Sequence, residues 1–320
     1  MSSPGHCRGF TEFPERKRPL ITIKDVAWLL YVYPLRWLSS VIPARAVRFL
    51  GRMAVPLCQL VTRRDKERMV TILRRALGSE PSEAELRHIS RQWVSNGVRR
   101  SFNRLTRKAS ESAMRGYRVE IRGLEHLKEA SGAGSGVIVV AGHFFGSRLM
   151  RRALEKAGYP VMGVRAGRPL DWALGRFGIR FVRPRLLPSA AESAGGRVRL
   201  DDPDCTLKIV SRLRSGGLVT ILLDSPLSRN TLRLPFLGGH FRFSTGFLEI
   251  ARHTGCAVIP ALSGVDGSAF TVAFLEPLRL LPAPAREDFV SANLPTLVST
   301  LESWVLQYPD QWESWLSLEP

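Results

Sequence analysis

Short apolar runs alternate with amphipathic segments through most of the chain beyond residue 118. The runs that we expect to form strands span 119–121, 137–141, 161–164, 179–182, 218–223 and 257–262. The segments that we expect to form helices span 149–157, 170–177, 205–214, 245–254 and 290–306. Such alternation predicts an α/β fold, with a sheet flanked by helices.

The region before this alternation has the pattern of helices. From residue 63 to residue 108, apolar residues recur at helical spacing, with a break at Gly78 and a restart at Ser82. Glu85 stands three residues after Ser82, which is the spacing of a capping box at a helix N-terminus. The arginines of this region are expected on the solvated faces of its helices.

Residues 26–61 mix aromatic and aliphatic side chains with Arg36, Arg45, Arg48 and Arg52. Prolines interrupt the apolar runs, so none reaches the roughly 18 uninterrupted apolar residues that a membrane-spanning helix needs. Two interpretations remain open: a segment that lies on or dips into a membrane interface, or an amphipathic helix pair packed on the protein's own core. The interleaving of basic and apolar residues favours the membrane interface.

The basic residues are concentrated in the first part of the chain, whose formal net charge is +19. Residues 1–120 hold 24 Lys or Arg and 10 Asp or Glu, whereas residues 216–320 hold 6 basic and 10 acidic residues. A cationic surface attracts nucleic acid, anionic lipid headgroups or acidic proteins. Because aromatic and aliphatic residues accompany the arginines, we expect a membrane surface as a partner and no nucleic acid.

These patterns divide the chain into three expected parts. They are a flexible basic N-terminus over residues 1–20, a helical membrane-associated region over residues 21–120 and an α/β domain over residues 121–320. The first part has no apolar core or cleavage site behind its basic residues, so we expect no cleaved signal peptide and a cytoplasmic location.

The cysteines and histidines exclude several classes of site. Four cysteines in 320 residues have neither metal-ligand spacing nor the density of a disulfide framework. The chain has no Gly-x-Ser-x-Gly motif and no close pair of cysteines or histidines, which argues against a serine hydrolase and a zinc enzyme. We expect neither a metal nor a cofactor.

Polar side chains stand at the ends of three expected strands. His143, Arg165 and Asp224 each follow an apolar run. In open α/β sheets, ligands bind outside the carboxyl ends of strands, so these three groups can converge on one site. Gly142 and Gly146 flank His143, and the backbone N–H groups of the helix expected to follow can stabilise an anion. His143 is therefore the candidate acid–base residue.

A series of short motifs follows in order along the chain. They are Gly142-His143-Phe-Phe-Gly, Val164-Arg165, Leu223-Asp224-Ser-Pro, Leu234-Pro-Phe-Leu-Gly238, Thr245-Gly246, Ala251-Arg-His-Thr-Gly-Cys-Ala-Val-Ile-Pro260 and Tyr308-Pro-Asp-Gln-Trp312. Their order and spacing resemble those of the bacterial lipid A late acyltransferases, the lauroyl and myristoyl transferases, across residues 20–315. The segment 26–61 resembles that family's membrane-associated N-terminal helix.

The resemblance implies both a fold and an activity. The fold is a glycerolipid-acyltransferase-like mixed sheet flanked by helices. The activity is transfer of an acyl chain from acyl-acyl carrier protein, or from acyl-CoA, to a hydroxyl or amine of a membrane lipid, with a lipid A-type acceptor favoured. The implied location is the cytoplasmic face of the bacterial inner membrane, with peripheral or N-terminal attachment.

The resemblance also implies roles for individual residues. In the family mechanism a histidine removes the proton of the acceptor hydroxyl, and His143 matches this base. Asp224 is the candidate for the carboxylate that orients the imidazole. The residues that match the family's substrate-binding positions are Phe144, Phe145, Gly146, Ser147, Arg148, Arg165, Gly238 and Thr245.

The chain departs from the family at Arg148, where the family has a carboxylate five residues after the histidine. A guanidinium has no acceptor for the imidazole N–H, and its charge disfavours an imidazolium. Three arrangements remain open. In the first, Asp224, or less readily Glu249, orients His143. In the second, a backbone carbonyl fixes the tautomer, or Arg148 binds a phosphate or carboxylate of the substrate while His143 acts as an unassisted base. In the third, catalysis is lost, and the protein only binds lipid or acyl carrier protein.

Two further groups have open interpretations. The arginines between residues 165 and 185 form either a solvated charged face or a docking patch for acidic headgroups, phosphates or acyl carrier protein. Trp304, Trp312 and Trp315 form either a packed C-terminal clasp or an interfacial aromatic set.

Overall fold

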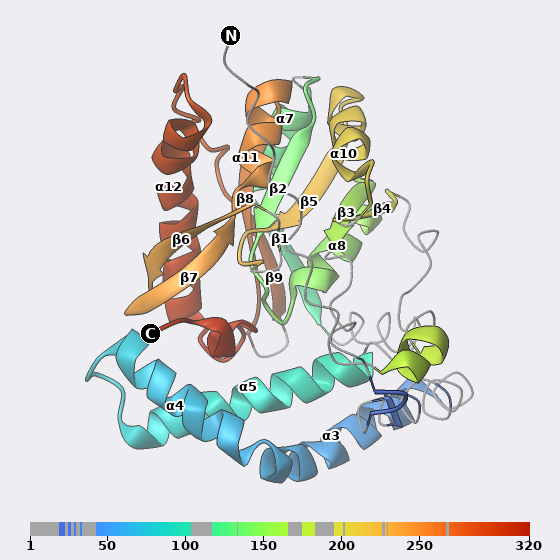
Figure 1. Ribbon diagram of the computed structural model, residues 1–320, viewed down its shortest axis with the longest axis vertical. Helices are drawn as coiled ribbons and strands as arrows, with labels where there is room; N and C mark the ends of the chain where they lie inside the picture. Colours follow the sequence, from blue (N-terminus) through green and yellow to red (C-terminus); the bar gives the residue numbers. More distant parts are fainter. Residues whose placement is uncertain are drawn as a thin grey trace. The chain divides into compact units, whose positions relative to one another are not determined.

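The computed structural model of the chain forms two compact units (Figure 1). The smaller unit contains Met1–Trp37 and Arg168–Pro188, and the larger contains Leu38–Gly167 and Ser189–Pro320. The structure describes residues 19–22, 25–26, 29, 33, 43–103, 117–132, 134–165, 175–182, 195–200, 202–225, 228, 230–266 and 269–320.

The larger unit is built on a mixed sheet, in which the described residues form seven strands. The strands are β1 (Arg118–Arg122), β2 (Val137–Ala141), β3 (Val161–Arg165), β4 (Arg197–Arg199), β5 (Leu218–Leu222), β8 (Ala257–Asp266) and β9 (Ala269–Phe274). Their order across the sheet is β1-β9-β8-β2-β5-β3-β4, and every neighbouring pair is parallel except β8 and β9. The expected α/β fold with a mixed sheet is confirmed, and β4 and β9 are strands that the apolar pattern did not predict.

The central strand β2 shows why the sheet is covered on both faces. All five of its residues are apolar and buried. Successive side chains point to opposite faces of a sheet. Ile138 and Val140 accordingly join one apolar cluster, while Val137, Val139 and Ala141 join the other. Such continuous apolar strands are typical of parallel sheets between two layers of helices.

Helices supply both of these layers. They are α7 (Leu124–Gly132), α8 (Ser147–Lys156), α10 (Cys205–Arg214), α11 (Gly246–Thr254) and α12 (Arg286–Gln307). Residues of α7 and α8 belong to the cluster of Val139, whereas residues of α10, α11 and α12 belong to the cluster of Val140. The expected helices in this region are confirmed, and α7 is an additional one.

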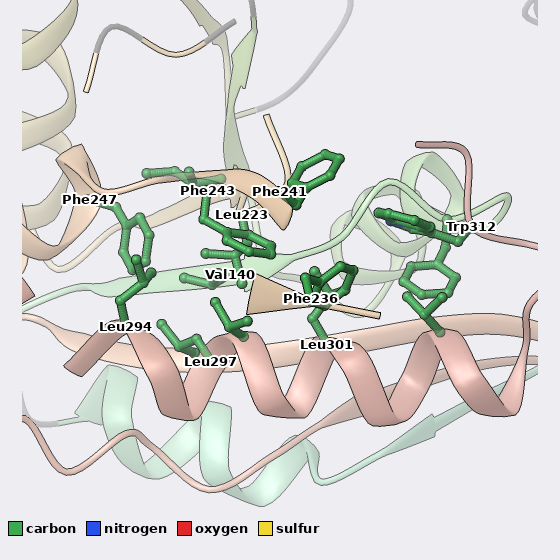
Figure 2. Packing of buried hydrophobic residues seen from close by; sticks show 14 of the residues in the cluster. Val140, Leu223, Phe236, Phe241, Phe243, Phe247, Leu294, Leu297, Leu301 and Trp312 are labelled. Carbon is green, nitrogen blue, oxygen red and sulfur yellow. The ribbon is translucent and has the colours of Figure 1, made fainter. Parts of the chain in front are cut away.

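A separate hairpin closes the core beside α12. Its strands are β6 (Thr231–Phe236) and β7 (Gly239–Ser244), which pair antiparallel. Figure 2 shows Phe236 of the hairpin close to Leu301 of α12, in the same buried cluster. Trp312 lies next to Phe236, with ring centroids 5.5 Å apart. The hairpin therefore packs against Trp312, which follows α12 in the chain.

Three further helices precede the sheet in the larger unit. They are α3 (Ala44–Val61), α4 (Arg63–Leu77) and α5 (Glu83–Asn103). The expected capping box is confirmed, since the N–H of Ser82 donates to Glu85 Oε2 at 2.7 Å and the N–H of Glu85 donates to Ser82 Oγ at 3.3 Å. Met69 and Leu73 of α4 are wholly buried in the main core cluster.

The helix α3 differs from α4 in its exposure. Large apolar side chains that share one face of α3 are exposed: Phe49, Leu50, Met53, Leu57, Leu60 and Val61. Among the described residues, no helix is both long enough and apolar enough to cross a bilayer.

In the smaller unit, two distant segments are tied together by Asp25. Its carboxylate is wholly buried and accepts hydrogen bonds from the N–H of Gly175 at 3.0 and 3.1 Å. The N–H of Thr22 donates to the same carboxylate at 2.6 Å. These donors satisfy a charge that burial alone would disfavour.

One expected strand of the smaller unit is wrong. Gly178–Val182 forms a π-helix, where the apolar pattern predicted a strand over 179–182. Periodicity cannot separate a short apolar strand from a short helical segment. Here the rings of Phe177 and Phe181 contact each other with centroids 4.8 Å apart, a contact that helical spacing allows. Most of the helix expected over 170–177 lies outside the described residues.

We predict that Gly123→Ala destabilises the larger unit far more than Gly78→Ala. Both glycines have positive φ angles, +67° and +72°, and such rarely populated backbone conformations cost an alanine about 1 to 3 kcal/mol. A Cβ at Gly123 would lie 1.9 Å from the carbonyl oxygen of Phe274, whereas nothing lies within 4 Å at Gly78. The clash adds about 1 to 3 kcal/mol. Urea unfolding midpoints measure the difference, and equal shifts would contradict the close approach at Gly123.

Candidate active site

The register of two neighbouring strands brings His143 and Asp224 together. β2 and β5 pair in parallel, and the pairing continues beyond β5, where the N–H of Leu223 donates to the carbonyl of Ala141 at 2.8 Å. His143 and Asp224 follow at equivalent positions at the carboxyl edge. β3, which ends at Arg165, is the next strand beyond β5. The three polar strand ends singled out in the sequence thus belong to three adjacent strands.

The side chains of His143 and Asp224 form a hydrogen bond. His143 Nδ1 lies 2.8 Å from Asp224 Oδ1, and the backbone N–H of His143 donates to both carboxylate oxygens at 2.9 and 3.0 Å. Because an ionised carboxylate only accepts hydrogen bonds, Nδ1 carries the ring proton and Nε2 has the lone pair. In the part of the chain that the structure describes, Nε2 has no hydrogen-bond partner, and the His143 side chain is 32% exposed.

The pair is also coupled electrostatically. Burial by itself would lower the pKa of His143, but the charge and hydrogen bonds of Asp224 outweigh it, so this pKa is raised above its ordinary value. Glu313 acts in the same direction. Burial would raise the pKa of Asp224, but the charge and hydrogen bonds of His143, with a hydrogen bond from Trp312, lower it. The carboxylate therefore stabilises the imidazolium that forms when Nε2 takes up a proton.

Asp224 is fully buried, and a buried carboxylate needs hydrogen-bond donors in place of water. The indole Nε1–H of Trp312 donates to Oδ2 at 2.7 Å. The Ser314 hydroxyl lies 3.5 Å from the same oxygen, at the limit of a hydrogen bond. Together with the backbone N–H of His143, these groups hold both carboxylate oxygens.

The segment that carries Trp312 runs antiparallel to the loop that carries His143. We call Gln311–Glu313 the tail segment. The N–H of Phe145 donates to the carbonyl of Gln311 at 3.0 Å. At the other end, the N–H of Glu313 donates to the carbonyl of His143 at 2.8 Å. Backbone pairing thus fixes the tail segment next to the histidine.

A side-chain amide anchors the tail segment to the sheet. Gln311 Nε2 donates to the carbonyl of Val265 in β8 at 2.6 Å, and the N–H of Val265 donates to Gln311 Oε1 at 2.8 Å. The side-chain amide of Gln311 therefore makes with Val265 the two hydrogen bonds that the backbone of a neighbouring strand would otherwise make. This pairing fixes the register of the tail segment.

The helix α5 holds the tail segment from another direction. Three side chains at helical spacing on α5 contact the tail segment or the residue before it, Asp310: Trp93, Asn96 and Arg100. Trp93 donates to the carbonyl of Trp312 at 2.9 Å. Asn96 donates to the carbonyl and to the carboxylate of Asp310, at 3.0 Å each. Arg100 forms an ion pair with the carboxylate of Glu313. The helical region is thereby connected to the histidine loop through the tail.

The tryptophans near the C-terminus form a packed clasp, which confirms one of the two interpretations. Trp312 and Trp315 are wholly buried, with ring centroids 5.0 Å apart. Trp304 is half-buried, and its indole N–H donates to the carbonyl of Ser263 at 3.3 Å. These rings serve the core of the protein.

The two residues after His143 are buried in the core. Phe144 forms an isolated bridge with Trp312, and Phe145 is also buried. A Cβ at Gly146 would lie 2.3 Å from the ring of Phe270, so only glycine fits there without a shift of its neighbours. These positions therefore shape the loop that presents His143.

The remaining polar candidates, Ser147, Arg148 and Arg165, lie near the same edge of the sheet. Ser147 and Arg148 occupy the first turn of α8, directly after the loop of His143. The placement of the Arg148 side chain lies outside what the structure describes. Arg165 is the last residue of β3 and is half-buried.

Thr245 and Gly238 lie at opposite ends of β7. Thr245 is buried at the start of α11, and the N–H of the preceding Ser244 donates to the carbonyl of Leu223 at 2.8 Å, next to Asp224. Gly238 lies in the hairpin turn against α4, where a Cβ would be 2.8 Å from the carbonyl oxygen of Arg75. The hairpin thus brings Thr245 close to the site and ties Gly238 to the helical region.

The orienting carboxylate of His143 is Asp224. Glu249, the weaker candidate, lies on α11 with its carboxylate 3.9 Å from His253 and 3.8 Å from Arg286. Because Nδ1 of His143 bonds Asp224, no backbone carbonyl is needed to fix the tautomer. Of the arrangements left open by the sequence, the geometry matches the first.

The tail segment and the face of α5 that holds it were not among the residues predicted from the sequence. The motif Tyr308–Trp312 indicated the family, but it did not indicate which residues Trp312 contacts. Long-range side-chain bonds leave no periodic signal. In the described ranges, no group of three or more His, Cys, Asp and Glu side chains could hold a metal ion.

Comparison with known families assigns the chain to one of them. Residues 14–317 match the family of bacterial lipid A biosynthesis acyltransferases. The chain belongs to this family, so the resemblance noted in its motifs is confirmed. No curated protein sequence matches the chain significantly.

We predict that Asp224→Asn lowers the pKa of His143. The substitution keeps the size of the side chain but removes the negative charge that raises this pKa. Titration of isotopically labelled histidine side chains by NMR measures the change. The NMR signals of His253, whose side chain is 73% exposed, are the internal control and should be the same in the variant and in the wild type. An unshifted His143 would contradict the coupling.

Proposed function

We propose that the protein transfers a fatty acyl chain from acyl-acyl carrier protein, or from acyl-CoA, to a hydroxyl or amine of a lipid A-type acceptor. Membership of the family supports acyl transfer in lipid A biosynthesis. The single observation that carries the proposal is the hydrogen bond between His143 Nδ1 and Asp224 Oδ1. It supplies the oriented base that the sequence alone left in doubt at Arg148.

The pair supports a general base mechanism. His143 Nε2 accepts the proton of the acceptor hydroxyl as its oxygen attacks the thioester carbonyl carbon. Asp224 remains ionised and stabilises the imidazolium, as the buried aspartate does in other histidine dyads. When the tetrahedral intermediate collapses, the carbon–sulfur bond breaks and Nε2 returns the proton to the departing thiolate. The products are an ester and a free thiol, with the base regenerated.

We assign substrate binding to the groups around this edge of the sheet. Ser147 and Arg148 lie in the first turn of α8, directly after the loop of His143. Arg165 ends β3, the strand next to β5, which Asp224 follows. Acyl-CoA, acyl carrier protein and lipid A-type acceptors all carry phosphates, which arginine binds well. Arg148 then serves the substrate, while Asp224 serves the imidazole.

The proposed location is the cytoplasmic face of the bacterial inner membrane. The exposed apolar face of α3, which includes Met53 and Leu57, supports it. Exposed basic residues are close to this face in the sequence, at Arg52 on α3 and at Arg63 and Arg64 in the first turn of α4. Such a mixture of apolar and basic residues binds anionic lipid surfaces. The acceptor is a membrane lipid, so attachment along α3 keeps the enzyme with its substrate.

We predict that His143→Ala and Asp224→Asn each reduce acyl transfer by about 10²- to 10⁴-fold. The assay supplies labelled acyl-acyl carrier protein, and separately acyl-CoA, with a lipid A precursor in mixed micelles. His253→Ala is the matched control and should retain wild-type activity. Transfer by the His143 variant at the wild-type rate would refute the enzyme proposal. Wild-type protein that binds the substrates without transfer would instead support a binding protein.

We predict that Leu57→Glu weakens binding to vesicles containing anionic phospholipid by about tenfold or more, because one large apolar contact is lost and a like charge is added. Vesicle co-sedimentation measures the change. Leu207→Glu on α10 is the control, since Leu207 is 69% exposed and Leu57 is 65% exposed. Equal losses in the two variants would exclude α3 as the contact surface.

A further inference from the structure

The buried carboxylate of Asp224 has two oxygens with different partners. Oδ1 faces the imidazole Nδ1 of His143 at 2.8 Å. Oδ2 accepts the indole N–H of Trp312 at 2.7 Å, from a residue 88 positions along the chain. The backbone N–H of His143 is shared between the two oxygens, at 2.9 Å from Oδ1 and 3.0 Å from Oδ2. Trp312 makes the shortest bond to Oδ2, so its indole restricts the rotation of the carboxylate about its terminal bond more than the other donors to this oxygen do.

We propose that Trp312 is the positioning residue of this active site, and that its indole N–H orients Asp224 and weakens the field that Asp224 exerts on His143. The inference rests on the proposed function for its kinetic consequences. Its structural consequence, a change in the proton affinity of His143, does not depend on any substrate.

The indole cannot turn away from the carboxylate. The Trp312 ring is wholly buried, with ring centroids 5.5 Å from both Phe236 and Phe241 and 5.0 Å from Trp315. Its backbone carbonyl accepts the indole N–H of Trp93 from α5. Packing and backbone bonds thus hold the donor in one direction.

The indole dipole has a definite electrostatic effect. Its positive end points at Oδ2 and partly offsets the carboxylate charge that His143 experiences. Among the described side chains, the other charged group that acts on His143 is Glu313, whose carboxylate pairs with Arg100. This ion pair does not change when the indole N–H is removed. Loss of the N–H therefore leaves a less compensated carboxylate, which raises the pKa of His143.

The test compares Trp312→Phe with Trp315→Phe. Both residues are wholly buried and both lose an indole N–H, but Trp315 donates to the carbonyl of Pro309 and does not contact Asp224. We expect Trp312→Phe to lower kcat about tenfold, the effect of one hydrogen bond to a charged group, with little change in KM. The acid limb of its pH–rate profile moves to higher pH. Trp315→Phe leaves that limb unmoved.

The comparison with Trp315→Phe separates positioning from simple damage. Because burial lowers the pKa of His143, a core loosened by the loss of an indole would also move the limb upward, and Trp315→Phe is the control for that effect. Asp224→Asn moves the same limb to lower pH, opposite to Trp312→Phe. Should Trp312→Phe fail to fold, 3-benzothienylalanine at position 312 keeps the shape of the ring without the N–H. An unmoved or lowered limb in the variant that folds, or an equal shift in Trp315→Phe, overturns the proposal.

NMR titration of His143 tests the positioning role of Trp312 separately from the proposed acyl transfer. A higher His143 pKa in the variant supports the positioning role even if wild-type protein transfers no acyl chain. An unchanged or lower pKa overturns the positioning role even if acyl transfer is demonstrated.

Discussion

The buried charge of Asp224 is the constraint around which the site is organised. A carboxylate without exposure to solvent is stable only when donors surround it. Here the donors come from the histidine loop and from the tail segment, and the tail is itself held by α5 and β8. Four parts of the larger unit therefore cooperate to keep one aspartate ionised beside one histidine.

The sheet register explains how the chain works with an arginine at position 148. Parallel neighbours end at the same edge, so a residue after β5 can occupy the space beside a residue after β2. The imidazole needs an acceptor at Nδ1, but the acceptor need not come from its own helix. With Asp224 in that place, His143 keeps a carboxylate acceptor at Nδ1 although position 148 is an arginine.

Much of the fold was predictable because burial imposes periodicity. The runs 137–141 and 205–214 matched β2 and α10, and the ends of three strands marked His143, Arg165 and Asp224. Periodicity was insufficient for the short run 179–182, which is helical. It also carried no information about strand order, so only the structure showed that the three strands are adjacent. The contribution of Trp312 depends on a single side-chain bond across the fold, which no local pattern encodes.

The tail segment has a consequence for folding. The bonds that join His143 to Asp224, Asp224 to Trp312 and Trp93 to Trp312 span 81, 88 and 219 residues of chain. Loops of this length close late, after local helices and hairpins have formed. A partly folded chain therefore has its histidine but not its oriented tautomer. The imidazole that is paired with Asp224 and oriented by it therefore appears only with the native topology.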